Sequence, residues 1–310
     1  MFIDQFNTPK FKFFLYLPFP LLFFGLMIIN FLAIKLLNLD VNQIIQDEIN
    51  RNGVNSFFID SMVPFLVGLI LLFLWVKYIQ KETLVRFTTS RSKIDWKRFF
   101  FAFSIWGTFQ IVITLISYFL SPEDYVLNFD LSKFIVFFAL AVVLIPFQTS
   151  FEEYLFRGHL MQGLGVVTKN RWFPLLFTSI AFGLMHISNP EIDKLGYIVL
   201  VYYIGTGFFL GIITLMDEGL ELALGFHLAN NLVMALLVTA NWTAFQTHSV
   251  FKDISEPSAG FEVVMPVLII FPLLLFVFAK KYGWNNWKEK LTGKVTSSNN
   301  IEAIEYSGND

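Results

Sequence analysis

Apolar segments with few or no charged residues recur along almost the whole sequence, and they limit the fold more than any other feature. Eight can be traced, at residues 13–34, 61–76, 99–120, 134–165, 172–187, 195–216, 220–240 and 261–279. Apolar stretches of about 18 residues are long enough to cross the hydrocarbon core of a bilayer as helices. The sequence therefore predicts an all-α polytopic membrane protein with about eight transmembrane helices, in a single transmembrane domain at residues 1–290.

The composition agrees with this class of fold. Hydrophobic residues make up 55% of the chain and charged residues 15%, and the chain has no cysteine. Without cysteine there is no disulfide, no thiol nucleophile and no cysteine-based metal site. The polar tail at residues 291–310 is predicted to be disordered and cytoplasmic. We expect membrane lipids around the protein and no nucleic-acid partner.

The distribution of basic residues predicts the orientation in the membrane. With eight spans, both termini lie on one side, and most of the 22 lysines and arginines fall on that side. Because cytoplasmic loops are enriched in lysine and arginine, both termini are predicted to be cytoplasmic. The cysteine-free, phenylalanine-rich composition with short loops further favours a bacterial plasma membrane.

A charged stretch interrupts the fourth apolar segment. Glu152, Glu153 and Arg157 follow directly on the uncharged run of residues 134–151. Ionised groups at membrane depth are costly, so they are usually paired, functional or both. On an α-helix, Glu153 and Arg157 lie four residues apart on one face and are predicted to form an ion pair. Glu152 points elsewhere and remains free to accept a proton, unless the whole group is only an ion cluster at a helix end.

Two later helices carry further polar residues. His186 lies on the fifth segment; His227 and Asn231 lie four residues apart on one face of the seventh, with Asn230 to the other side. Each could serve only as a hydrogen-bonding residue between packed helices. However, Glu152 and His186 are equally far from the loop that joins their helices, and His227 lies at a similar depth. A polar site buried between helices 4, 5 and 7 is therefore predicted.

The motifs Glu-Glu-x-x-x-Arg, Phe-x-x-x-His and His-x-x-x-Asn, in this order on successive hydrophobic helices, resemble those of the CPBP family, also called Abi. These intramembrane proteases include type II CAAX prenyl endopeptidases and bacterial proteins connected with bacteriocin processing or self-immunity. The resemblance covers residues 134–237, so the catalytic helices are expected at about residues 134–240. The remaining helices carry no motif of the family.

The resemblance implies roles for individual residues. It assigns Glu152 and His186 to the activation of the attacking water. It assigns His227 and Asn231 to the stabilisation of the oxyanion. The two other charged residues of the first motif fall in supporting positions: Glu153 and Arg157. These residue types suit amide hydrolysis, which needs a proton acceptor for water and donors for the developing negative charge.

The resemblance leaves the cofactor open, because the family has been described both as metalloproteases and as glutamate-dependent proteases without metal. The cofactor is therefore either none or a divalent metal such as zinc. If a metal is bound, Glu152, His186 and His227 are the expected ligands, with a fourth position left for water. Asn231 suits an oxyanion donor better than a metal ligand, which favours the metal-free alternative.

The expected function is that of an intramembrane endopeptidase of the CAAX-protease or bacteriocin-processing type, with its site open towards the cytoplasmic side. The expected substrate is a peptide or protein, for which a lipid-modified C-terminus is one option. The alternative is a non-catalytic membrane protein, such as a bacteriocin self-immunity factor, a scaffold or a transporter, that binds through the same polar layer. The complete set of Glu, His, His and Asn favours the enzyme, because a binding protein does not need all four.

Overall fold

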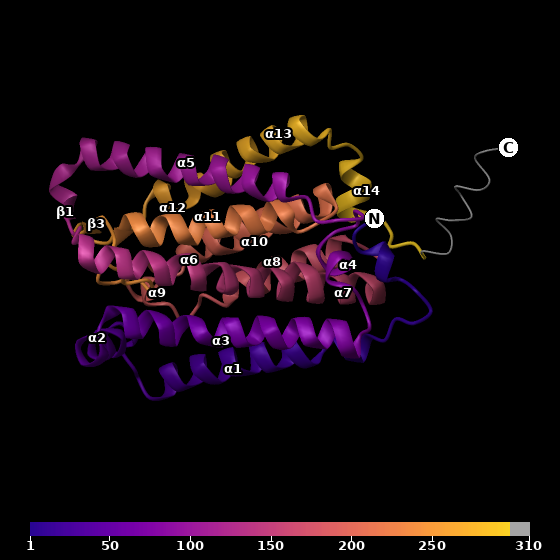
Figure 1. Ribbon diagram of the computed structural model, residues 1–310, viewed down its shortest axis with the longest axis horizontal. Coiled ribbons are helices and arrows are strands. Elements are labelled where there is room, and N and C mark those ends of the chain that lie inside the picture. The colour runs from indigo at the N-terminus through magenta and orange to yellow at the C-terminus, as the bar shows by residue number, and fades with distance from the viewer. Residues whose placement is uncertain (298–310) are drawn as a thin grey trace.

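Helices form almost the whole structure, a computed structural model that describes residues 1–297 (Figure 1). Six helices are long and apolar enough to cross a membrane: Pro18–Leu36, Val54–Ile79, Trp96–Leu120, Leu131–Thr168, Val199–Asp217 and Phe261–Tyr282. Two shorter apolar helices, Trp172–Leu184 and Glu221–Leu237, lie where the fifth and seventh spans are predicted. The chain is thus an integral membrane protein, with an apolar helix at each of the eight predicted places.

The helices and strands have the following bounds. The α-helices are α1 Pro18–Leu36, α2 Val41–Asn52, α3 Val54–Leu74, α4 Leu84–Thr88, α5 Trp96–Leu120, α6 Leu131–Glu153, α7 Met161–Thr168, α8 Trp172–Leu184, α9 Pro190–Leu195, α10 Val199–Asp217, α11 Glu221–Leu237, α12 Phe261–Met265, α13 Phe271–Tyr282 and α14 Trp287–Thr292. Short 3₁₀ helices occupy Asp4–Phe6, Phe13–Tyr16 and Pro122–Asp124. The strands are β1 Tyr125–Leu127, β2 Val238–Thr239 and β3 Phe251–Asp253.

Three of the long helices contain a π-helical turn. These turns are Trp75–Ile79 after α3, Tyr154–Leu160 between α6 and α7, and Pro266–Ile270 between α12 and α13. A π turn winds more residues into each turn than an α-helix and so shifts the face that the following side chains occupy, and such turns are frequent at functional sites. The second of them follows Glu153 directly.

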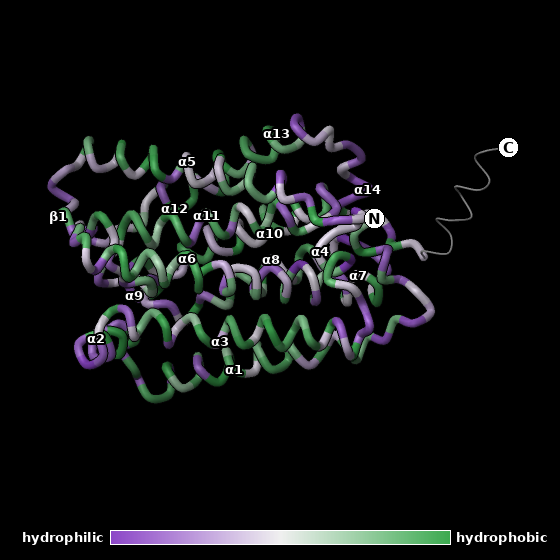
Figure 2. Tube along the Cα trace, in the orientation of Figure 1, coloured by the Kyte–Doolittle hydropathy of each residue, from purple (hydrophilic) through white to green (hydrophobic). Residues whose placement is uncertain are grey.

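The two ends of the helical bundle differ. The N-terminus, α4, α7 and α14 lie at one end, which we call the terminal end, whereas α2, α9 and the strands lie at the opposite, distal end (Figure 1). Hydrophobic residues follow most of the length of the long helices, and hydrophilic residues gather mainly at these two ends (Figure 2). This pattern is that of a bundle in a bilayer, whose exposed apolar residues face lipid.

Three predicted loops at the distal end contain regular structure. The segment after α1 holds the amphipathic helix α2, whose N-terminus is capped by Asp40 accepting a hydrogen bond from the backbone N–H of Gln43 (2.9 Å). Side-chain caps of this kind satisfy N–H groups that the first helical turn leaves free. In the other loops, β3 pairs with β1 in antiparallel and with β2 in parallel orientation. This small sheet is the one addition to the predicted all-α class within residues 1–297.

The two ends of the chain meet at the terminal end of the bundle. Asp4 forms an ion pair with Arg171 in the turn between α7 and α8 (2.6 Å), and it accepts a hydrogen bond from the backbone N–H of Thr296 (2.7 Å). Lys294 pairs with Asn170 of the same turn. Of the tail predicted to be disordered, residues 291–297 therefore contact the bundle, and residues 298–310 lie outside the described residues.

Candidate active site

Glu152 lies near the C-terminal end of α6 and is almost wholly buried, with 2% of its surface exposed. One turn earlier, Gln148 donates a hydrogen bond from Nε2 to Glu152 Oε1 (2.5 Å). The four-residue spacing places both side chains on one face of the helix. Glu152 Oε2 has no hydrogen-bond partner among the described residues. Gln148 thus holds one carboxylate oxygen and leaves the other free.

Glu153 and Arg157 form the predicted ion pair, which is confirmed. Glu153 Oε1 lies 2.9 Å from Arg157 Nη1, and both side chains are fully buried. Arg157 also donates from Nη2 to the carbonyl oxygen of Gly207 on α10 (3.0 Å), and its guanidinium lies 4.3 Å from the ring centroid of Phe182 on α8. The assumption that an α-helix continues through Arg157 is wrong, because α6 ends at Glu153 and the π-helical turn begins at Tyr154.

His227 on α11 lies between the two carboxylates of α6. Its Nδ1 is 2.8 Å from Glu153 Oε1, and its Nε2 is 3.6 Å from Glu152 Oε2. Because an ionised carboxylate only accepts hydrogen bonds, Nδ1 carries a hydrogen. Nε2 is then an acceptor in the neutral ring and a donor in the imidazolium. Glu153 therefore fixes which nitrogen of His227 faces Glu152.

His186 lies just after the end of α8 rather than inside the helix, because α8 ends at Leu184. Its Nδ1 is 3.0 Å from the carbonyl oxygen of Phe182, and its ring stacks on Tyr203 of α10 with the centroids 4.0 Å apart. A carbonyl oxygen only accepts, so Nδ1 carries the hydrogen and Nε2 is left as an acceptor. The stacked tyrosine and this hydrogen bond fix both the ring plane and the tautomer of His186.

Asn231 on α11 is linked to Glu152 through Gln148. Its Nδ2 donates a hydrogen bond to Gln148 Oε1 (2.9 Å), and its Oδ1 accepts one from Nδ2 of Asn230 (3.1 Å). Asn230, which the helical phase places on another face, is therefore also part of this polar layer. It accepts a hydrogen bond at Oδ1 from the indole N–H of Trp106 on α5 (3.1 Å).

The four residues predicted as catalytic meet at one cavity. The cavity has a volume of about 880 Å³, and its wall includes Glu152, His186, His227 and Asn231. They come from α6, from the turn after α8, and from α11, which are the predicted helices 4, 5 and 7. The structure thus brings together the side chains that the motifs single out.

The cavity extends from this layer towards the distal end. There its wall is formed by α2, α9 and α12, with residues such as Ile45, Glu191 and Glu262 (Figure 1). On the other side of the layer, buried Phe156 and Phe226 pack in the core towards the terminal end. The cavity thus reaches the end of the bundle opposite the N-terminus. Which side of the membrane that end faces stays a prediction.

A segment of the chain matches a known family. Residues 131–233 match the family model described as type II CAAX prenyl endopeptidase Rce1-like. This segment is an Rce1-like domain. It contains every residue predicted for the site, and the resemblance drawn from the three motifs is confirmed.

One relative of the chain is the YyaK protein of Bacillus subtilis (strain 168), which is described as uncharacterised. It is 34% identical over 180 residues, which are 58% of this chain and 60% of that protein. The match thus spans less than two thirds of the relative's own length. No solved structure matches this chain.

The metal ligands suggested by the sequence do not form a metal centre in the Rce1-like domain. Across residues 1–297, no group of three or more His, Asp or Glu side chains could hold a metal ion. Nδ1 of His227 is on Glu153, and Nε2 faces the carboxylate of Glu152. Nδ1 of His186 is on a backbone carbonyl.

Sequence reasoning missed three residues of this site. Gln148 carried a usable signal, because it lies four residues before Glu152 in an otherwise apolar helix. Trp106 and Tyr203 carried none, since aromatic residues are frequent throughout the chain and their contacts depend on how α5 and α10 pack.

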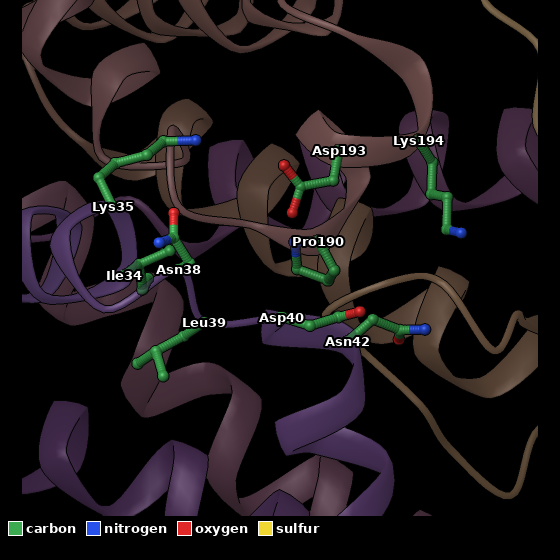
Figure 3. A pocket seen from close by; sticks show the side chains of 9 residues that line it. All are labelled: Ile34, Lys35, Asn38, Leu39, Asp40, Asn42, Pro190, Asp193 and Lys194. Carbon is green, nitrogen blue, oxygen red and sulfur yellow. The ribbon is translucent and has the colours of Figure 1, made fainter.

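A smaller pocket of about 400 Å³ lies at the distal end and shares Pro190 with the wall of the cavity (Figure 3). It is formed where the end of α1 and the start of α2 approach α9. Its polar side chains include Lys35, Asp40 and Asp193 (Figure 3). None of the residues predicted for the site lines it, so it belongs to the polar surface beside the mouth of the cavity.

Proposed function

We propose that this protein is an intramembrane endopeptidase that hydrolyses a peptide bond in the cavity of its Rce1-like domain. The observation that carries the proposal is the free oxygen of Glu152, buried at the cavity wall beside Nε2 of His227. A buried carboxylate oxygen without a partner is costly unless water or a ligand binds it. In a protease this position belongs to the attacking water.

In the proposed reaction, Glu152 and His186 act on that water. Glu152 takes a proton from the water as the water oxygen attacks the carbonyl carbon of the substrate, and Nε2 of His186 accepts a hydrogen bond from the same water. When the C–N bond breaks, the proton passes from Glu152 to the leaving nitrogen. Because Gln148 occupies Oε1, the atom that takes and returns the proton is Oε2.

The negative charge on the substrate oxygen is stabilised by His227 and Asn231. The Asn231 amide nitrogen has two hydrogens, of which one binds Gln148 and the other is available to the substrate. Because Glu153 binds Nδ1 of His227, donation from Nε2 to the substrate oxygen requires a hydrogen on both ring nitrogens. A single donor of this kind contributes roughly 10²- to 10³-fold to kcat.

The proposed substrate is a peptide or protein segment that lies at bilayer depth, including one with a lipid-modified C-terminus. Apolar side chains dominate the wall between the catalytic layer and the mouth, among them Phe57, Phe65 and Met265. Among the described residues, no lysine or arginine lines the cavity, whereas Glu191 and Glu262 do. Such a wall suits an apolar substrate peptide without acidic side chains.

We place the protein in a bacterial plasma membrane with both termini in the cytoplasm, because the basic residues concentrate at the terminal end. In that orientation, the mouth of the cavity faces the outer side of the membrane.

The proposal is tested with purified protein in detergent micelles and a fluorescent peptide that ends in a prenylated CAAX sequence. In parallel, the protein termini of membranes with and without this chain are compared by mass spectrometry. The wild type is expected to generate new termini, and Glu152→Gln is expected to lower the rate by roughly 10²- to 10⁴-fold. Glu123→Gln, which is exposed and outside the cavity wall, is the matched control and should stay within about twofold of the wild type.

Unchanged cleavage by Glu152→Gln would overturn the mechanism. If the wild-type protein cleaves neither the peptide nor any membrane protein, yet binds the peptide, the non-catalytic alternative is correct.

A further inference from the structure

A row of side-chain amides runs along the cavity wall from α5 to the catalytic carboxylate. The amides are those of Asn230, Asn231 and Gln148. Each donates a hydrogen bond to the next, and Gln148 donates to Glu152. The first link is the indole N–H of Trp106, which donates to Asn230 Oδ1 (3.1 Å). The row joins three helices, α5, α11 and α6.

The two ends of the row determine its direction. An indole nitrogen only donates hydrogen bonds, and an ionised carboxylate only accepts them. A side-chain amide between them has an acceptor on one side and a donor on the other. With its Oδ1 on Trp106, Asn230 must present Nδ2 to Asn231. Asn231 must then present Nδ2 to Gln148, and Gln148 must present Nε2 to Glu152.

Two further side chains contact Asn230 Oδ1. Gln110 of α5 donates from Nε2 to Asn230 Oδ1 (3.3 Å), and the hydroxyl of Tyr202 on α10 donates to the same oxygen (3.5 Å). Only the indole N–H of Trp106 fixes the direction, because the Tyr202 hydroxyl and the Gln110 amide can each also accept a hydrogen bond, whereas an indole nitrogen cannot. Trp106 is well placed as the anchor, since it is 4% exposed and packs on Phe226.

We propose that Asn230, anchored by Trp106, is a positioning residue that sets the orientation of both Asn231 and Gln148. The proposal rests on the proposed function. In the observed direction, Asn231 turns its NH₂ towards the site, where one hydrogen remains for the substrate oxyanion. In the reversed direction, Gln148 and Asn231 would instead turn carbonyl oxygens towards Glu152 and the oxyanion, and both contacts would be repulsive.

The test compares four single variants and one double variant for cleavage of the prenylated peptide. Trp106→Phe keeps an aromatic ring but removes the indole N–H, and Asn230→Asp keeps the shape but replaces the donor to Asn231 with an acceptor. We expect each to lower kcat by roughly 10- to 100-fold with KM within about twofold. Trp284→Phe is the matched control, because it removes an indole N–H that binds Asp217 (3.2 Å), outside the cavity wall, and it should leave kcat unchanged.

The fourth single variant is Gln148→Ala, and the double variant combines it with Trp106→Phe. These side chains do not touch in the row, so independent structural effects would multiply, whereas a shared positioning role predicts a double variant no slower than the slower single variant. Unchanged kcat in Trp106→Phe and Asn230→Asp, or multiplying effects, would overturn the proposal even if Glu152→Gln is inactive. Absence of cleavage by the wild type would overturn the proposed function and this inference with it.

Discussion

Replacement of Arg157 tests how much the buried ion pair with Glu153 contributes to stability and to activity. Arg157 is fully buried, and its guanidinium binds Glu153 Oε1 at 2.9 Å and the carbonyl of Gly207 at 3.0 Å. Arg157→Met keeps a long apolar side chain and removes the charge. The carboxylate of Glu153 is then left in the core with His227 as its remaining partner, and breaking a buried pair in this way costs about 3–5 kcal/mol.

The double variant Arg157→Met with Glu153→Gln separates stability from activity. With both charges removed, most of the lost stability should return, and about 1–3 kcal/mol should remain for the lost hydrogen bond to the Gly207 carbonyl. Activity should not return, because Nδ1 of His227 has lost its carboxylate. We expect a rate roughly 10- to 100-fold below that of the wild type, as for other residues that orient a reactive group.

The assay is unfolding by sodium dodecyl sulfate in mixed micelles, together with the cleavage rate of the peptide. Arg51→Met is the control, since its side chain is 72% exposed and lies 3.8 Å from Glu48, and exposed pairs contribute less than about 1 kcal/mol. If Arg157→Met costs less than about 1 kcal/mol, or if the double variant is no more stable than the single one, the buried pair does not have the role assigned to it.

Three further predictions concern the opening, the packing and the cofactor. Because the chain has no cysteine, single cysteines can replace Glu262 at the distal end and Lys93 at the terminal end. They should react with an impermeant maleimide from opposite sides of the membrane. Labelling of both from one side would contradict the placement of the two ends on opposite sides. Gly207→Ala should destabilise the protein by about 1–3 kcal/mol in the same unfolding assay, because a Cβ there would lie 2.5 Å from the backbone oxygen of Ser179. The control Gly25→Ala should be neutral or slightly stabilising, because a Cβ at Gly25 would have no atom within 4 Å. Dialysis against a chelator should leave the cleavage rate unchanged, and a loss that zinc restores would show that the site binds a metal.

The apolar helices and the four motif residues of the site could be predicted from the sequence. Apolar length alone locates the helices, and the spacing of Glu153 and Arg157 gives their ion pair, which survives even though the helix between them becomes a π turn. The motifs also name four of the residues that line the cavity.

The rest depends on contacts between segments that are far apart in the chain. Trp106 and Asn230 are separated by 124 positions, and their hydrogen bond requires α5 and α11 to pack with these faces together. The direction of the cavity depends on α2 and α9, two short helices within segments that read as polar loops. His227 was expected to act on the oxyanion or, if a metal is bound, as a ligand, and its contact with Glu153 follows from the approach of α11 to α6.

The most direct test of the central claim is the single-turnover cleavage rate of Glu152→Gln protein saturated with the prenylated peptide. Saturation removes any effect on binding, so the rate reports the chemical step alone. If Glu152 takes the proton of the attacking water, the peptide should bind with unchanged affinity and be cleaved roughly 10²- to 10⁴-fold more slowly than by the wild type. A rate within about tenfold of the wild type would contradict the assignment of Glu152 as the residue that activates water.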